Sequence, residues 1–240
     1  MIYNLVASAK STRGLFALLI DPDKHSKKGL SDLASLAQNC KVDLFLLGGS
    51  LIRNSLEQAF QSLRSESNIP IVLFPGHAIH VYPKADAILL LSLISGRNPE
   101  FLIGNHVVAA HSIKDSGMEV IPTGYILINC GEPTSVQYMS NTTPIPLNKP
   151  DIAVATAIAG EQLGLKAIYL EGGSGANTPV PPASIREIST NVELPIIVGG
   201  GLKTPQQVRD TREAGASMVV VGNAIEHNKH LLSDLVQASR

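Results

Sequence analysis

The chain has 240 residues, of which 19 are Lys or Arg and 20 are Asp or Glu, giving a formal net charge of −1. Apolar residues make up 44% and charged residues 16%, which excludes a disordered chain and provides for a sizeable core. The balanced charge argues against a general nucleic-acid binder, and an aromatic content of 4% without Trp argues against a base-stacking platform. We therefore expect one domain over residues 1–240.

The cysteines and the apolar runs indicate a cytoplasmic protein. Cys40 and Cys130 cannot form a disulfide framework or a four-cysteine zinc site. The first ten residues lack the apolar stretch of a signal peptide. The longest nearly apolar run, Ala87–Ile94, is far shorter than the ~20 residues of a membrane-spanning helix.

Short apolar runs alternate with amphipathic segments along the chain. The apolar runs are continuous, as in parallel strands that are buried on both faces, and we expect strands at Leu15–Ile20, Leu44–Leu47, Ile71–Phe74, Ala87–Leu91, Glu119–Ile121 with Tyr125–Ile128, Ala167–Leu170, Ile196–Val198 and Met218–Val221. Helices are expected at Leu30–Gln38, Leu51–Leu63, Pro150–Leu163, from Thr204-Pro205 onward, and at Ala224–Ala238. Eight such units in this length predict an α/β fold of the (β/α)₈ TIM-barrel type more closely than an open doubly wound sheet.

Two segments depart from this regular pattern. Pro75, Gly76 and Pro83 fall between the third and fourth strands, so we expect the third helix to be missing or replaced by extended chain. The polar, proline-rich stretch Cys130–Lys149 follows the fifth strand. Loops of this length are usually lids, binding loops or disordered segments.

Glycine-rich turns follow the last three predicted strands, where TIM barrels often hold phosphate. Glycine allows backbone N–H groups to approach an anion closely, and helix N-termini add partial positive charge. Connecting turns alone would explain one such segment, but three in successive places favour a phosphate cup made of backbone. The segments are Gly172-Gly173-Ser174-Gly175, Gly199-Gly200-Gly201 and Gly222-Asn223.

Two carboxylates are expected at the same end of the barrel. Asp21, fixed by the proline that follows it, is either a turn residue or an oxygen ligand for Mg²⁺. Ser50 would cap the second helix or reach a metal-bound water or phosphate. Glu171 ends the sixth strand and would point the same way as Tyr169, so a raised pKa would suit it as a base.

Five motifs together resemble one enzyme family. They are IDPDK, LLGGS, YLEGGSGA, VGGGLKTP and VVGNAIE, each at a predicted strand end between Leu15 and Glu226. The set is similar to geranylgeranylglyceryl phosphate synthase and its heptaprenylglyceryl phosphate relatives, in their larger, archaeal-type branch. Leu19 stands where some bacterial relatives of the smaller branch carry Lys, which argues against the heptaprenyl substrate.

The resemblance implies a prenyltransferase of phospholipid biosynthesis, which joins sn-glycerol 1-phosphate to a long allylic diphosphate, usually geranylgeranyl diphosphate, and releases diphosphate. It implies that Asp21 and Ser50 hold Mg²⁺ and the diphosphate, that Glu171 takes the proton of the attacking hydroxyl, and that Tyr169 orients the substrate or the allylic cation. Glycerol 1-phosphate would contact Tyr169, Leu170, Glu171, Gly172, Gly173, Ser174, Gly175, Gly200, Gly201, Gly222 and Asn223.

The resemblance also implies a homo-oligomer, either a dimer or a hexamer. The lipid product would bring the protein into transient contact with a membrane surface. The prenyl tail needs an apolar groove, and the missing third helix together with the run Ile88–Ile94 would line one. Two alternatives stay open. One is another phosphate-binding barrel, such as a sugar-phosphate isomerase that uses Asp21 and Glu171. The other is a binder of phosphate or prenyl lipid without catalytic activity.

Overall fold

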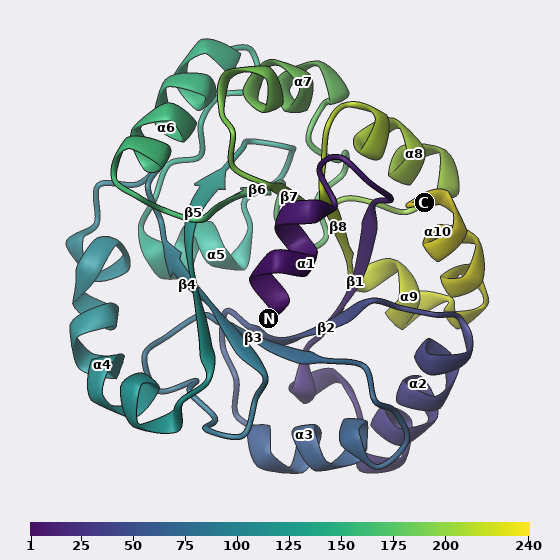
Figure 1. Ribbon diagram of the computed structural model, residues 1–240. Coiled ribbons are helices and arrows are strands. Elements are labelled where there is room, and N and C mark those ends of the chain that lie inside the picture. The colour runs from purple at the N-terminus through teal and green to yellow at the C-terminus, as the bar shows by residue number, and fades with distance from the viewer.

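Eight parallel strands close into a barrel in which each strand pairs with the next along the chain and β8 pairs with β1 (Figure 1). The computed structural model describes residues 1–240. The strands are β1 (Leu15–Ile20), β2 (Leu44–Gly49), β3 (Ile71–Pro75), β4 (Ala87–Ser92), β5 (Glu119–Leu127), β6 (Ala167–Glu171), β7 (Ile196–Gly199) and β8 (Met218–Val221). The predicted TIM barrel is confirmed.

Helices surround the barrel (Figure 1). The longer ones are α2 (Lys27–Asn39), α3 (Leu56–Arg64), α4 (Asn105–Ser116), α6 (Pro150–Gln162), α7 (Pro182–Asn191) and α8 (Pro205–Glu213). The shorter ones are α1 (Ile2–Ser8), α5 (Ser135–Ser140), α9 (Asn223–His227), α10 (Leu232–Ala238), the 3₁₀ turns η1 (Pro22–Lys24) and η3 (Lys229–Leu231), and the π turn η2 (Glu100–Gly104). None of the helices combines the length and apolar character needed to cross a membrane.

Alternate side chains of each strand serve two different apolar layers. In β1, Leu15 and Ala17 point into the barrel, whereas Phe16, Leu18 and Ile20 belong to the layer between the barrel and its helices. Both layers are buried, which explains why the strands read as continuous apolar runs. In β6 the odd-numbered residues, such as Tyr169, point into the barrel.

No helix forms between β3 and β4, as predicted from the prolines and glycine there. Leu73 and Ile88, which a third helix would cover, pack instead against Ala109 and Ile113 of α4. The strand pairing between β3 and β4 is correspondingly short, with two matched residue pairs. Helix α4 therefore covers part of the barrel wall that a third helix would have covered.

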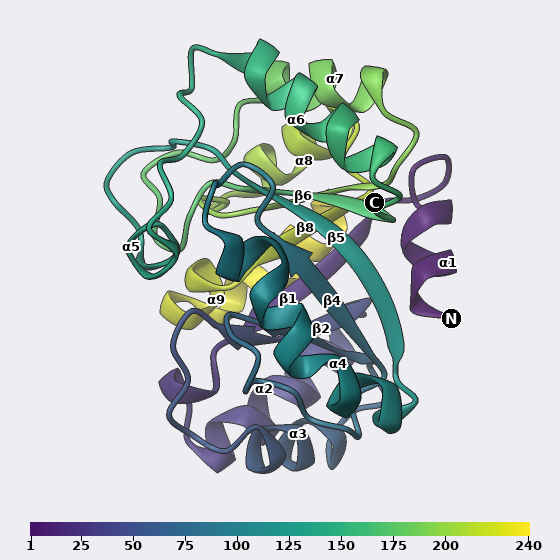
Figure 2. The same ribbon diagram turned by 90° about the vertical axis from the view of Figure 1, so that its left-hand side faces the viewer.

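The two ends of the barrel differ in character (Figure 2). Helix α1, which was not predicted, closes the end where the strands begin and places Val6 and Ala9 in the inner layer. The backbone N–H groups of Ile2 and Tyr3 donate to the Glu119 carboxylate. Helices α5 and α9 lie at the opposite end, where the strands finish.

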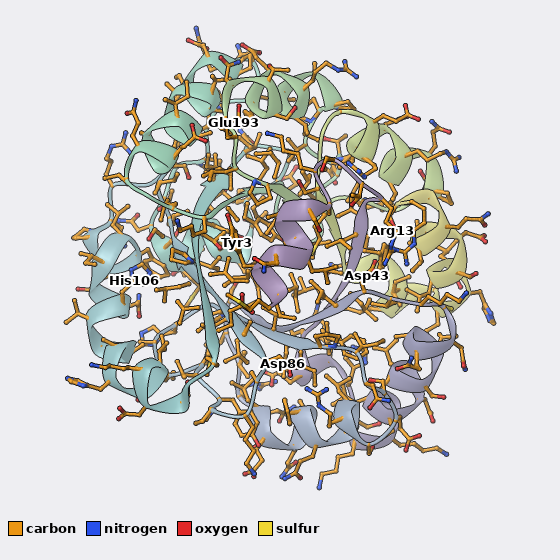
Figure 3. The ribbon with its side chains drawn as sticks, viewed as in Figure 1. Tyr3, Arg13, Asp43, Asp86, His106 and Glu193 are labelled. Atoms are coloured by element: carbon orange, nitrogen blue, oxygen red, sulfur yellow. The ribbon has the colours of Figure 1, made fainter.

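Carboxylates at the α1 end of the barrel are used for structure. Asp43, placed just before β2, accepts hydrogen bonds from the Phe16 N–H and from Arg13 and Arg240, so it ties the last residue to the start of two strands (Figure 3). Asp86 lies just before β4 and links it to the start of β3, because its carboxylate accepts from the Ile71 N–H at 2.7 Å. These groups have protein partners and are not available for chemistry.

Several predicted boundaries were wrong. The helix expected over Leu51–Leu63 begins at Leu56, because the Ser55 hydroxyl accepts from the Gln58 N–H and caps it, so Ser50 is not a helix cap. Strand β5 runs unbroken through Pro122, whose carbonyl still accepts from the Lys166 N–H. The helix expected over Ala224–Ala238 is interrupted by the extended residue Asn228 and by the turn η3.

The corrected cap predicts a difference between two serines. Ser55→Ala is expected to lower the free energy of unfolding by about 1 kcal/mol, since it removes the acceptor that satisfies the first turn of α3. Ser50→Ala is the matched control and is expected to change it by less than about 0.5 kcal/mol. Urea unfolding of both variants measures this, and equal losses would contradict the assignment.

Candidate active site

A cavity of about 640 Å³ occupies the end of the barrel where the strands finish. Turns that follow β1, β2, β6, β7 and β8 form its wall, and α5 covers one side. Its charged lining residues are Asp21, Lys24, Glu171, Lys203 and Glu226. Lys24 and Glu226 form a 2.9 Å ion pair across two of these turns. This is the position where TIM-barrel enzymes place their active sites.

The glycine turns that predicted an anion cup line the cavity on the β6–β8 side. Gly175, Gly200 and Gly201 have φ values of 78°, 87° and 73°, a left-handed conformation that glycine adopts without strain. The Ser174 hydroxyl donates to the Asn223 side-chain oxygen at 3.2 Å and joins two of the turns. Backbone N–H groups with no protein acceptor line the cavity here, at Ser174, Gly175, Gly200, Gly201 and Leu202. Free N–H groups in a concave turn are an anion-binding arrangement.

Three residues expected in this cup do not line the cavity. The Leu170 side chain packs in the layer between the barrel and its helices. The Gly172 N–H donates to the Gly199 carbonyl, and the Gly173 N–H donates to the Glu171 carboxylate. These three residues shape the cup from behind, whereas Gly222 and Asn223 line it as expected.

Glu171 is buried and fixed at both carboxylate oxygens. The Gly173 N–H donates to Oε1 at 2.6 Å, and the Tyr125 hydroxyl donates to Oε2 at 3.0 Å. Burial raises the pKa of the Glu171 carboxyl, and these two hydrogen bonds oppose that rise. The carboxylate still lines the cavity beside the cup. A buried carboxylate with a raised pKa and an open side is suited to accept a proton.

Tyr169 lies beside Glu171, as their alternation in β6 predicted. Its ring stacks with Tyr125 and Phe74 at centroid separations of 5.2 Å and 5.1 Å. The Tyr169 hydroxyl is buried and has no hydrogen-bond partner. A side chain at Gly199 would overlap this hydroxyl, so the glycine provides its space. The hydroxyl also lies close enough to Glu171 to help lower the pKa of that carboxyl.

Sequence reasoning did not single out Tyr125, which contacts both residues. It pairs with Tyr169 across the β5–β6 ladder, and Leu127 pairs with Glu171. In one unbroken strand, the odd-numbered residues of β5 would have been expected to point into the barrel, and Tyr125 is one of them. The prediction from the sequence instead divided this strand at Pro122. The register between β5 and β6 is needed to place Tyr125 at the cavity.

The turns after β1 and β2, next to β8 of the cup, carry the two predicted metal-binding residues, Asp21 and Ser50. The Asp21 Oδ1 atom accepts from the Asp23 N–H at 3.0 Å, while the carboxylate lies against the Gly49 backbone, where a Cβ atom would be 3.5 Å from Oδ2. Asp23 itself accepts from the N–H groups of Arg53 and Asn54. Asp23 therefore holds the turn after β2 and is turned to protein donors.

This donor set fits one kind of cation. No three His, Cys, Asp or Glu side chains come together in the structure to hold a metal ion by themselves. Mg²⁺ commonly binds through one or two carboxylates and completes its shell with waters and substrate phosphates. The single carboxylate of Asp21, next to the Ser50 hydroxyl at an open cavity, agrees with that chemistry.

A second, apolar cavity of about 90 Å³ fills the position of the missing helix. Phe74, Tyr125, Val136 and Met139 line both cavities, so the two adjoin. The rest of its wall comes from β4, α4 and the segment that replaces the third helix, including Val81, Ile88, Leu90, Leu91, Ala109 and Ile113. The arrangement places an apolar channel next to a polar site.

The segment 130–149 is more ordered than its composition indicated. It contains α5, whose Val136 and Met139 face the cavities, and Ile145 bridges to Ile128 at the end of β5. Cys130 is buried rather than in an open loop, and burial, with the Glu171 charge, raises the pKa of its thiol to about 12. It has no nucleophilic character at neutral pH.

A family model agrees with this architecture over almost the whole length, since the PcrB family model matches residues 9–239. The chain belongs to the PcrB family. The geranylgeranylglyceryl phosphate synthase of Chitinophaga pinensis is 48% identical to this PcrB-family chain, covering 99% of it and 95% of the relative. The enzyme of the same name from Korarchaeum cryptofilum is 42% identical, covering 94% and 93%.

A solved structure of a relative, determined with a bound substrate, has the same fold as this chain. The (S)-3-O-geranylgeranylglyceryl phosphate synthase of Thermoplasma acidophilum, in complex with its substrate sn-glycerol-1-phosphate, has a TM-score of 0.94 to this PcrB-family chain. The sequences are 26% identical, and the match covers 99% of this chain and 98% of the other. The resemblance inferred from the five motifs is confirmed.

Proposed function

We propose that the protein is a geranylgeranylglyceryl phosphate synthase. It joins sn-glycerol 1-phosphate to a long allylic diphosphate, taken here as geranylgeranyl diphosphate, through an ether bond. One observation carries the proposal: the cup of free N–H groups, the buried base Glu171 and the apolar cavity adjoin at one end of the barrel. The names of the family relatives support it.

The acceptor phosphate is assigned to the cup around Gly175, Gly200 and Gly201. The donors there are backbone N–H groups, which match phosphate oxygens without a cationic side chain. The glycerol part of the molecule then lies toward Glu171 and the free Tyr169 hydroxyl. Positioning of this kind replaces a random encounter between two substrates and lowers the barrier by several kcal/mol.

In the transfer, the bond between the prenyl carbon and the diphosphate oxygen breaks, and a glycerol hydroxyl oxygen forms the new bond to that carbon. Glu171 accepts the hydroxyl proton, and diphosphate leaves with the electron pair of the broken bond. The rings of Phe74, Tyr125 and Tyr169 pack against one another and line the cavity. Aromatic rings near the reacting carbon favour cationic character there.

The prenyl tail is assigned to the apolar cavity in place of the third helix. Each buried CH₂ group contributes about 0.8 kcal/mol, so an apolar channel there binds a long tail strongly. Asp21 and Ser50 are assigned to Mg²⁺ and the diphosphate. When bound, Mg²⁺ supplies positive charge that offsets the charge developing on the leaving diphosphate.

A radiochemical assay tests the function. The protein is incubated with Mg²⁺, radiolabelled sn-glycerol 1-phosphate and prenyl diphosphates of different lengths, and the products are extracted into organic solvent. We expect label in the organic phase, most with geranylgeranyl diphosphate. Label that stays in water for every chain length would contradict the proposal. Light scattering coupled to size-exclusion chromatography tests the predicted dimer or hexamer.

The cup predicts a specific effect at Gly200. Gly200→Ala is expected to raise KM for glycerol 1-phosphate at least tenfold, since a Cβ atom would lie 2.6 Å from the Glu171 Oε1 atom and from the Gly173 nitrogen. Gly164→Ala is the matched control, because Gly164 also has a left-handed φ, of 84°, but no atom within 4 Å of the added Cβ. Steady-state kinetics compare the variants, and similar KM changes would argue against the cup.

A further inference from the structure

We propose that Tyr125 is a positioning residue for the base Glu171: its hydroxyl holds one carboxylate oxygen and fixes the direction in which the carboxylate faces the acceptor substrate. The inference rests on the proposed function for the identity of the acceptor. It assigns a separate task to each of the two tyrosines in the cavity.

The strand register brings the two groups together. Tyr125 of β5 pairs with Tyr169 of β6, so Glu171 lies one inward-facing position further along the neighbouring strand. The Tyr125 hydroxyl donates to Oε2 of Glu171 at 3.0 Å. The Gly173 N–H holds the other oxygen, Oε1, at 2.6 Å. The carboxylate is therefore fixed at two points on two elements.

The Tyr125 ring is itself held in place. It is 6% exposed and lies within 6.0 Å of the Phe74 ring centroid and 5.2 Å of the Tyr169 centroid. The backbone before it is closely packed, since a Cβ atom at Gly124 would lie about 3 Å from three side chains. A hydroxyl on such a ring cannot turn away from Glu171 without moving its neighbours.

Tyr169 differs from Tyr125 in one respect that matters for function. Both hydroxyls are buried at the same cavity, and the hydrogen bond of full geometry to Glu171 comes from Tyr125, at 3.0 Å. The Tyr169 hydroxyl makes no such bond, although it also lowers the pKa of Glu171, as the smaller of the two contributions. Tyr125 is therefore the tyrosine that holds Glu171, and Tyr169 is the one assigned to the ligand.

The surrounding charges agree with this role. Burial raises the pKa of Glu171, and the Tyr125 hydroxyl is one of the donors that oppose the rise. The titratable groups facing Glu171 are Tyr125, Tyr169 and Cys130, and burial keeps the pKa of all three well above neutrality. The other charged groups of the cavity, Asp21, Lys24, Lys203 and Glu226, lie on other turns. Removing the Tyr125 hydroxyl therefore leaves the ionised carboxylate less stabilised.

Tyr125→Phe tests the proposal, with the pH dependence of kcat/KM as the main readout. The acid limb is expected to move to higher pH by about one unit, because the carboxylate loses a donor. At a pH below both limbs the rate is expected to fall about tenfold relative to the native protein, and to recover toward it as pH rises. The dissociation constant for glycerol 1-phosphate, measured by calorimetry, is expected to stay within about twofold.

Two variants serve as comparisons. Tyr169→Phe is expected to lower kcat and to move the acid limb less than Tyr125→Phe does, because the Tyr169 hydroxyl makes no hydrogen bond of full geometry to Glu171 and contributes less to lowering the pKa of Glu171. Tyr82→Phe removes another buried hydroxyl that has no partner and lies outside the cavity, and is expected to change neither quantity. An acid limb that stays in place in an active Tyr125→Phe variant overturns the proposal.

A second measurement does not depend on turnover. The carboxylate stretching band of Glu171, identified by its loss in Glu171→Gln, is titrated by difference infrared spectroscopy in native protein and in Tyr125→Phe. A higher midpoint in the variant supports the positioning role even where no prenyl transfer is found, in which case only the proposed function fails. An unchanged midpoint overturns the positioning role, whatever the enzyme activity.

Discussion

Glu171→Gln is expected to lower kcat by about 10²–10⁴-fold while leaving the affinity for glycerol 1-phosphate nearly unchanged. The amide cannot accept the hydroxyl proton, and loss of a positioned base costs rates of this order. The Gln side chain has the same shape, and its oxygen can still accept from the Gly173 N–H. Single-turnover kinetics measure the rate, and calorimetry measures the affinity.

The same substitution is expected not to destabilise the fold. Burial raises the pKa of the Glu171 carboxyl, which means that the folded protein bears a cost for the ionised form. Gln removes that charge, so the free energy of unfolding at neutral pH stays equal or rises. A variant that keeps both its stability and its native rate would remove Glu171 from the mechanism.

The raised pKa also sets the pH dependence of the native enzyme. Glu171 works as a base only when ionised, so kcat/KM is expected to rise with pH through the pKa of Glu171. Because burial raises that pKa, the acid limb lies above the ordinary glutamate value of about 4.3. A pH–rate profile measures this limb. Its absence in Glu171→Gln would assign it to this residue.

Asp21→Asn is expected to reduce turnover by about 100-fold or more at a fixed Mg²⁺ concentration. The substitution removes the negative charge from the one carboxylate beside Ser50, while the amide oxygen can still accept from the Asp23 N–H. Substitutions around metal ligands lower metal affinity by 10–100-fold, and loss of the ligand charge is expected to cost at least as much. The activity is measured against Mg²⁺ concentration.

Asp23→Asn is the matched control for Asp21. Asp23 accepts hydrogen bonds from Arg53 and Asn54, and we expect its substitution to leave the Mg²⁺ concentration for half-maximal activity unchanged. Asp21→Asn is expected to raise that concentration without changing KM for glycerol 1-phosphate, which is assigned to the backbone N–H groups around Gly175, Gly200 and Gly201. Equal shifts in both variants would contradict the assignment of the metal to Asp21 alone.

The barrel could be predicted from the sequence because its strands are buried on both faces. Met218–Val221 was placed with its observed bounds, and the cup glycines follow from the turns after β6, β7 and β8. Helix α3 was started too early because Leu51 and Ile52 continue its apolar pattern. The signature Ser55 followed by Gln58 three residues later would have corrected it.

Other features depend on contacts between distant segments. Tyr125 reaches Glu171 only through the register of β5 on β6, which a single sequence does not specify. Helix α1 is short, and its position depends on the hydrogen bonds of its first N–H groups to Glu119. The Gly172 and Gly173 N–H groups were expected to bind phosphate but are already occupied, which only the folded turn reveals.

The backbone origin of the cup has a consequence for how the enzyme can change by mutation. Among amino-acid substitutions, only replacement by proline removes a peptide N–H group. Substitutions can therefore damage the cup mainly at the glycines that adopt a left-handed backbone, such as Gly175, Gly200 and Gly201. The cavity proposed for the tail is lined mostly by side chains, and each of these can be exchanged for a larger or smaller one. Preference for the lipid tail can therefore drift among descendants of this protein while the phosphate acceptor stays fixed.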